Sequence, residues 1–126
     1  MRGALALAEF LRERPHAPLR AVVIWEPVLD SDTGPPAVDL ITAFDDPRVT
    51  RLWDPKRVTS QAMQAGVRAA PKDFIGAEKA LEAEVMWDVV ALHPAGQRWE
   101  SSYPPPAWWD APVVQALQEL RGRINK

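Results

Sequence analysis

The chain has 126 residues, of which 47% are hydrophobic and 25% are charged. Both values are close to those of ordinary globular domains, so they favour neither a disordered nor a membrane-spanning class. The formal charge is −2, with 15 basic and 17 acidic residues mixed along the chain, which argues against a nucleic-acid partner. We therefore expect a single domain over residues 1–126.

The sequence contains no cysteine. Disulfides, thiol nucleophiles, iron–sulfur clusters and cysteine-based zinc sites are therefore excluded. The apolar run at the N-terminus is interrupted by Glu9 and continues into a charged, amphipathic stretch, which differs from a secretory signal peptide. No apolar run approaches the length of a transmembrane helix. These features predict a cytoplasmic protein with no membrane partner.

The first half of the chain predicts helices that alternate with two strands. Residues 3–14 place apolar side chains on one side of a helix, which Pro15 ends. Residues 19–25 form a short, β-branched and almost wholly apolar run, typical of a central strand buried on both faces. The elements expected after it are a loop over 26–36, a helix over about 36–44 and an alternating strand over 48–54.

The second half of the chain predicts more helix, then a hairpin and a closing helix. Residues rich in Ala, Gln, Glu and Lys lie on both sides of Pro71 and favour helices. A Pro-Ala-Gly turn separates two strand-like runs, and Gly96 supplies the positive φ that a hairpin turn needs. The expected elements are helices over 57–69 and 73–84, strands over 85–93 and 97–103, and an amphipathic helix over 107–123.

The order of these elements predicts the fold class. Strands joined by helical crossovers pair in parallel, and the later hairpin and closing helix complete one sheet. The expected architecture is an α/β thioredoxin-like three-layer sandwich, in which a central mixed sheet of about four strands is flanked by helices.

The run from Val22 to Trp25 resembles the apolar strand, ending in Trp, that precedes the redox motif of thioredoxins. With the Trp residues aligned, the two cysteine positions of that family fall on Leu29 and Asp32. The cis-proline of that family falls near Trp87 or Asp88. The resemblance implies a thioredoxin-like frame whose redox residues and supporting proline are replaced, so dithiol oxidoreductase chemistry is not expected.

A narrower resemblance rests on residues 25–29 and on the segment from Asp46 to Asp54. These segments are similar to a group of uncharacterised, cysteine-less bacterial proteins related to thioredoxins. That group supplies no activity to transfer to this chain. A function must therefore be argued from the residues themselves.

A candidate binding crevice follows from the expected sheet. In open α/β sheets ligands bind outside the carboxyl ends of the parallel strands. The residues that we expect around this crevice are Trp25, Glu26, Asp30, Asp32, Asp54, Trp87 and Asp88.

The carboxylates of this crevice have two interpretations. Oxygen ligands from Asp30, Asp32 and Asp54 suit a hard cation such as Mg²⁺ or Ca²⁺, and two carboxylates can also act as an acid and base pair. In the alternative interpretation, loop carboxylates cap turns and the next helix, with Asp30 or Asp32 in an Asx turn.

A candidate partner patch lies near the C-terminus. Tyr103, Trp108 and Trp109 flank a run of three prolines. Adjacent residues at a helix start point in different directions, so one Trp of the pair is expected to be exposed and available for docking. The alternative is that these aromatic side chains belong to the core and its turns.

The histidines offer no metal site, because His16 and His93 have no partner at helical or hairpin spacing, and both are expected at the surface. The sequence thus leaves two functional hypotheses. The first is a redox-inactive, thioredoxin-like binding module for a protein, peptide or small ligand, without a cofactor and compatible with a homodimer. The second is a metal-assisted hydrolase or metal-binding protein that uses the acidic residues of the 26–36 loop and Asp54.

Overall fold

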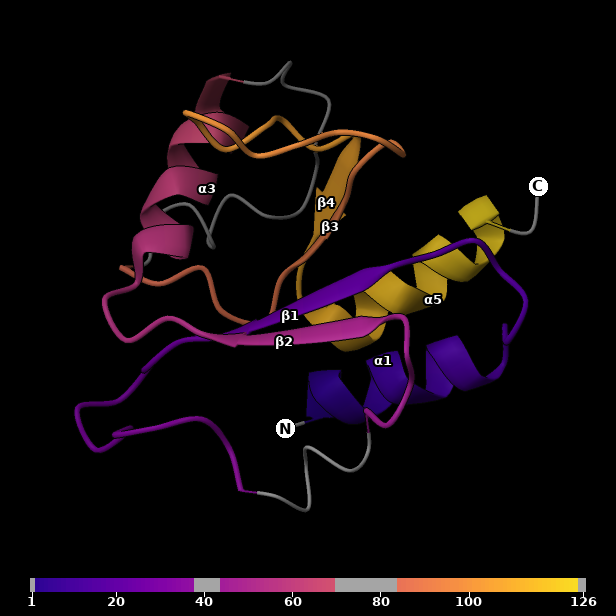
Figure 1. Ribbon diagram of the computed structural model, residues 1–126, viewed down its shortest axis with the longest axis horizontal. Helices are drawn as coiled ribbons and strands as arrows, with labels where there is room; N and C mark the ends of the chain where they lie inside the picture. The colour runs from indigo at the N-terminus through magenta and orange to yellow at the C-terminus, as the bar shows by residue number, and fades with distance from the viewer. Residues whose placement is uncertain (1, 38–43, 70–83, 125–126) are drawn as a thin grey trace.

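The computed structural model describes residues 2–37, 44–69 and 84–124 of the chain. Figure 1 shows their arrangement. The elements, labelled as in Figure 1, are α1 (Arg2–Arg12), β1 (Ala21–Trp25), β2 (Val49–Trp53), α3 (Val58–Ala69), β3 (Val90–Leu92), β4 (Trp108–Asp110) and α5 (Val113–Ile124). None of the helices in these described ranges has the length and apolar character needed to cross a membrane.

The strands form two separate sheets rather than one. β1 pairs with β2 in parallel, with Ala21 opposite Val49 and Trp25 opposite Trp53. β3 pairs with β4 in the antiparallel direction. The described residues are therefore mixed α/β. Their strands make two sheets of two strands each, so the expected central sheet of about four strands is not shown by them.

The helices and strands that are predicted from short stretches of their own sequence agree with the structure. The helices expected over 3–14 and 57–69 are α1 and α3, and the strands expected over 19–25 and 48–54 are β1 and β2. The helix expected over 36–44 lies largely outside the described residues, and the helix expected over 73–84 lies outside them except for its last residue.

The hairpin prediction is wrong in two respects. The strand expected over 85–93 is confined to β3, because the N–H of Met86 donates to the Ser60 hydroxyl and Asp88 has a φ of 58°, which an extended strand does not allow. The strand expected over 97–103 is loop, and its polar residues are largely exposed. The pairing partner of β3 is instead the segment that follows the three prolines.

β4 begins at Trp108, where the sequence predicted the start of a helix. Trp108 and Trp109 are 8% and 3% exposed, so pairing with β3 buries two large aromatic side chains on opposite faces of one strand. The helix begins only at Val113, directly after Pro112. Proline suits this place because it fixes φ and has no N–H to satisfy.

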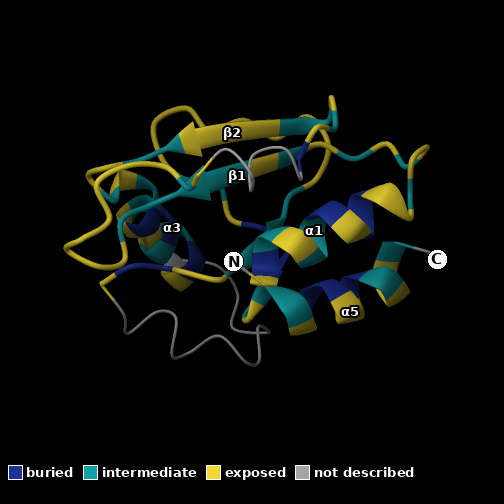
Figure 2. Ribbon diagram, turned by 90° about the horizontal axis from the view of Figure 1, so that it is seen from below, coloured by how far each residue is buried: buried dark blue, intermediate teal, exposed yellow. Residues whose placement is uncertain are grey.

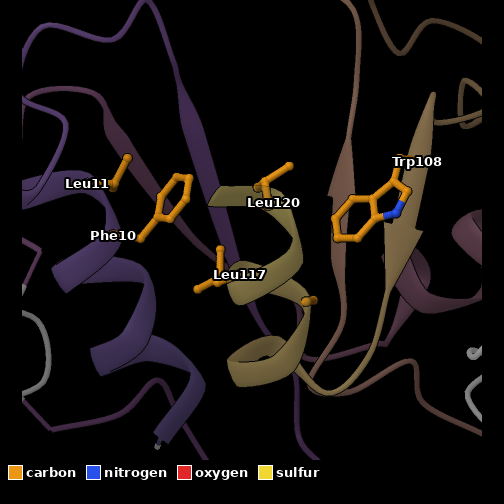
Figure 3. Packing of buried hydrophobic residues seen from close by; sticks show 6 residues of the cluster. Phe10, Leu11, Trp108, Leu117 and Leu120 are labelled. Atoms are coloured by element: carbon orange, nitrogen blue, oxygen red, sulfur yellow. The ribbon is translucent and has the colours of Figure 1, made fainter. Parts of the chain in front are cut away.

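The main core lies between α1, α5 and the two sheets. Figure 3 shows Phe10 of α1 facing Leu117 and Leu120 of α5, and Trp108 of β4 and Leu11 belong to the same cluster. The two helices run side by side in the same direction, since Gly3 approaches Val113 at their starts and Glu13 pairs with Arg121 at their ends.

A second core lies on the opposite face of β3 and β4. Here Trp109 packs with Met63 and Val67 of α3 and with Met86. Figure 2 shows the buried sides of the helices turned inward and their exposed sides outward. The short β3–β4 ribbon is thus covered by α5 on one face and by α3 on the other.

The end of α1 is tied to the start of β2 by one arginine. The Arg48 guanidinium donates to the carbonyl oxygens of Leu11 at 2.8 Å and Arg14 at 2.6 Å. It also forms a two-pronged ion pair with Asp46, and these hydrogen bonds lower the pKa of the Asp46 carboxyl to about 2. Arg48 therefore adds a charged donor to two carbonyl groups at and just beyond the C-terminus of α1, which also accept the N–H groups of Arg14 and Ala17.

The contact between α1 and α5 predicts opposite effects for two helical glycines. A Cβ at Gly3 would lie 2.8 Å from Val113 Cβ and from Asp88 Oδ1, whereas a Cβ at Gly122 meets nothing within 4 Å. We expect Gly3→Ala to lower the free energy of unfolding by about 1–3 kcal/mol through overpacking.

Gly122→Ala is the matched control, and we expect it to raise the free energy of unfolding by up to about 1 kcal/mol because Ala has the better helix propensity. Urea unfolding of both variants measures the two effects. Stabilisation by Gly3→Ala would contradict the close packing of the two helix starts.

Candidate functional site

Two of the predicted carboxylates meet where β1 and β2 end. Glu26 directly follows β1 and Asp54 directly follows β2. The parallel register, with Trp25 opposite Trp53, brings both residues to the same edge of the sheet, and the N–H of Asp54 donates to the carbonyl oxygen of Trp25 at 2.8 Å. The convergence expected from the sequence is therefore present for this pair.

Both carboxylates bind the first turn of α3. The N–H of Thr59 donates to Asp54 Oδ2 at 2.7 Å, and the N–H of Ser60 donates to Glu26 Oε1 at 2.9 Å. These N–H groups have no partner within the helix, and the helix dipole favours negative charge at this end. The two acidic side chains thus act as caps of α3, although neither belongs to that helix.

Ser60 connects three segments and was not identified from the sequence. Its side chain is buried, its hydroxyl donates to Glu26 Oε2, and the same oxygen accepts the N–H of Met86 at 2.9 Å. The one sequence feature that could have indicated its role is its position in the first turn of a helix that follows a strand. Because it is buried and bonded to both Glu26 and Met86, Ser60 is a structural link between these segments.

The environment separates the pKa values of the two carboxyls. Burial is the main reason that the pKa of Glu26 is raised, with a further contribution from Asp54, while hydrogen bonds from Ser60 act in the opposite direction. Burial also acts to raise the pKa of Asp54, but hydrogen bonds from Thr59, Val58 and Glu26 outweigh it and the net shift is downward. A proton shared by this pair therefore belongs to Glu26.

The other two carboxylates of the loop do not join this pair. Asp32 Oδ2 accepts the N–H groups of Val28 at 2.9 Å and Leu29 at 2.8 Å, so it closes a turn within its own loop. Asp30 is exposed and borders a separate cavity of about 240 Å³, beside Arg57 and Glu84.

The capping interpretation of the acidic residues therefore holds for Asp32 and Asp54. The residues considered for a metal, Asp30, Asp32 and Asp54, are not gathered into one site. Within the described parts of the chain, no group of three or more His, Asp or Glu side chains is placed to hold a metal ion.

A large cavity runs beside β1, with a volume of about 590 Å³. One wall is formed by consecutive residues 19–26 and the other by consecutive residues 85–92, while α1 and α5 supply apolar side chains beneath. Side chains of a strand alternate between its two faces, so a cavity on one face would be lined by every second residue. Here every residue of β1 lines the cavity, so the cavity lies along the edge of the strand.

Four of the residues predicted for the crevice line this cavity. They are Trp25, Glu26, Trp87 and Asp88. Trp87 is 60% exposed, and Asp88 accepts the N–H of Val113 at 3.3 Å. The sequence thus identified residues at one end of the cavity, but it did not predict that the cavity extends along β1.

The structure corrects the predicted aromatic patch. Trp108 and Trp109 are both buried, one in each core, so neither is exposed for docking. Tyr103 is half-buried, which raises its pKa to about 12, and its hydroxyl lies 2.8 Å from His93 Nε2. His93, expected at the surface, is also half-buried, and its Nδ1 lies 2.8 Å from Gln97 Oε1.

Comparison with known proteins identifies no relative: no family model, no curated protein and no solved structure matches the chain. The thioredoxin-like resemblance therefore stays a prediction. The cavity and the carboxyl pair at its end are the features from which a function is argued.

The raised pKa of Glu26 predicts a pH dependence of stability. A carboxyl whose pKa is raised on folding stabilises the protein most below its ordinary value of 4.5, and this contribution is lost as the pH rises through the folded pKa. Glu26→Gln removes this titration. We expect the wild type to lose stability relative to Glu26→Gln as the pH rises from 4.5 to 8, as measured by urea unfolding.

Glu100→Gln is the control, because Glu100 lies exposed in a loop. We expect this variant to keep the pH profile of the wild type. Parallel profiles for the wild type and Glu26→Gln would mean that Glu26 titrates alike in the folded and unfolded states.

Proposed function

We propose that this protein is a redox-inactive binding module whose ligand occupies the cavity beside β1. The observation that carries the proposal is the cavity itself. Its volume of about 590 Å³ lies within the range of roughly 300–1,000 Å³ that is usual for ligand sites. Without cysteine, the chain has no dithiol chemistry to perform at this place.

The lining of the cavity favours an occupant with an apolar body. Side chains of the main core, including Leu7, Phe10, Leu117 and Leu120, reach it from the two helices. Apolar walls with a few charged groups at the ends are typical of binding sites, in which the polar groups orient the ligand. Among the charged residues that line the cavity are Arg20 and Asp88.

The hydrolase hypothesis is less well supported by the same residues. An acid and base pair needs carboxyl oxygens that can reach a substrate. The oxygens of Glu26 and Asp54 accept hydrogen bonds from Ser60, Thr59 and Lys56. Their geometry is that of helix caps, which supports a binding module over an enzyme.

A small apolar probe tests the proposal. We expect the fluorescent probe N-phenyl-1-naphthylamine to bind the full chain at one site. Ala4→Leu enlarges a side chain that lines the cavity, and we expect it to weaken this binding about tenfold, or about 1.4 kcal/mol. Fluorescence titration measures the affinity.

Ala65→Leu provides the matched control. Ala65 is also helical, but it lies exposed on α3 and does not line the cavity. We expect this variant to bind the probe as the wild type does. Equal affinity of all three proteins, with unfolding curves showing that each is folded, would contradict the proposed site.

A further inference from the structure

The main chain of β1 is hydrogen-bonded on one side only. The N–H of Ala21 donates to the carbonyl oxygen of Arg48 at 3.0 Å, and the carbonyl oxygen of Trp25 accepts the N–H of Asp54 at 2.8 Å. In a parallel pair, the N–H and C=O of one residue face the same neighbour and those of the next residue face the opposite side. Ala21, Val23 and Trp25 therefore face β2, and Val22 and Ile24 face away from it.

The outward edge of β1 is open in the described structure. β1 has β2 as its only strand neighbour there, and no described residue forms a main-chain hydrogen bond with Val22 or Ile24. This is also the edge along which the cavity runs, since consecutive residues of β1 line it and consecutive residues 85–92 face them. Two N–H and two C=O groups thus point into a slot that has room for an occupant.

We infer that the occupant of this slot is an extended peptide segment of a partner protein, which adds as a strand to the free edge of β1. This inference rests on the proposed function and names the class of ligand. An edge strand presents alternating donors and acceptors, and another extended main chain is the ligand that matches them along its whole length. The five residues of β1 span about 17 Å at roughly 3.3 Å per residue, so the added strand is a short one.

The walls of the slot define the side chains of such a peptide. Alternate residues of an added strand point toward α1 and α5, where Leu7, Phe10 and Leu117 line the cavity, so these positions are apolar. The remaining alternate residues point to the other face of the sheet. There Val22 is 58% exposed, so these positions tolerate polar residues.

The charges at the two ends complement a peptide of mixed charge. Arg20 stands at the start of the β1 wall, whereas Glu26 stands at its end. Asp88 and Arg2 also line the cavity. Both oxygens of Glu26 are already hydrogen-bonded to Ser60, whereas Asp88 is exposed. A segment with an acidic residue toward Arg20 and a basic residue toward Asp88 fits this arrangement.

Amide exchange of the full chain tests the inference residue by residue. Linear octapeptides displayed on phage are selected against the protein, and the enriched peptide is synthesised as the probe. In the ¹⁵N-labelled free protein we expect the Val23 amide to exchange slowly and the Val22 and Ile24 amides to exchange fast. With the peptide bound, exchange at Val22 and Ile24 should slow at least tenfold, while Val23 changes little.

Methylation of the peptide nitrogens separates strand addition from simple apolar binding. We expect N-methyl groups at alternate peptide residues to raise the Kd at least tenfold, and N-methyl groups at the intervening residues to raise it less than twofold. Ala4→Leu should weaken peptide binding, and Ala65→Leu should not.

Several outcomes would overturn the inference. One is that no octapeptide is enriched, and another is that the peptide tolerates N-methylation at every position. A third is that the Val22 and Ile24 amides are protected from exchange in the free monomer, because the chain itself would then close the slot. Protection that rises with protein concentration, with a dimer in sedimentation equilibrium, would assign the edge to a second copy. If the fluorescent probe still binds in an Ala4→Leu-sensitive way, the proposed function survives and strand addition alone fails.

Discussion

The parallel pairing of β1 with β2 satisfies the main chain of β1 on one side and brings the ends of both strands together. From this pairing follow the meeting of Glu26 with Asp54, the capping of α3 by both carboxylates and the open edge along the cavity. The register also fixes which peptide groups of β1 remain available. The hydrogen bonds between β1 and β2 thus determine both where the two carboxylates lie and which edge of β1 stays open.

The two adjacent tryptophans explain how a three-residue strand can organise the C-terminal half of the molecule. Trp108 packs against α1 and α5, and Trp109 packs against α3. Because successive side chains of a strand point to opposite faces, one short strand joins two cores that share no buried residue among those the structure describes. The large apolar area of each ring compensates for the small number of hydrogen bonds in the β3–β4 pair.

Local sequence patterns correctly predicted those helices and strands whose conformation depends mainly on their own residues. Apolar periodicity located α1 and α3, and β-branched runs located β1 and β2; the rule for parallel strands then placed Glu26 beside Asp54. Prediction failed where distant contacts decide. Met86 is held by Ser60 of α3, and β4 forms at Trp108 because its neighbours in space, not in sequence, bury it. Ser60 was missed for the same reason, since its role depends on the two segments that it joins.

The arginine that closes the end of α1 also bears on the order in which the chain assembles. Arg48 reaches the carbonyl of Leu11 across 37 positions of sequence and that of Arg14 across 34. The N–H groups of Arg14 and Ala17 also donate to these two carbonyls, so the local turns can form before Arg48 is synthesised. The charged contacts are added only when the segment leading into β2 turns back toward α1. These contacts thus form together with the docking of β2, and they compensate part of the entropy cost of closing the long loop between α1 and β2.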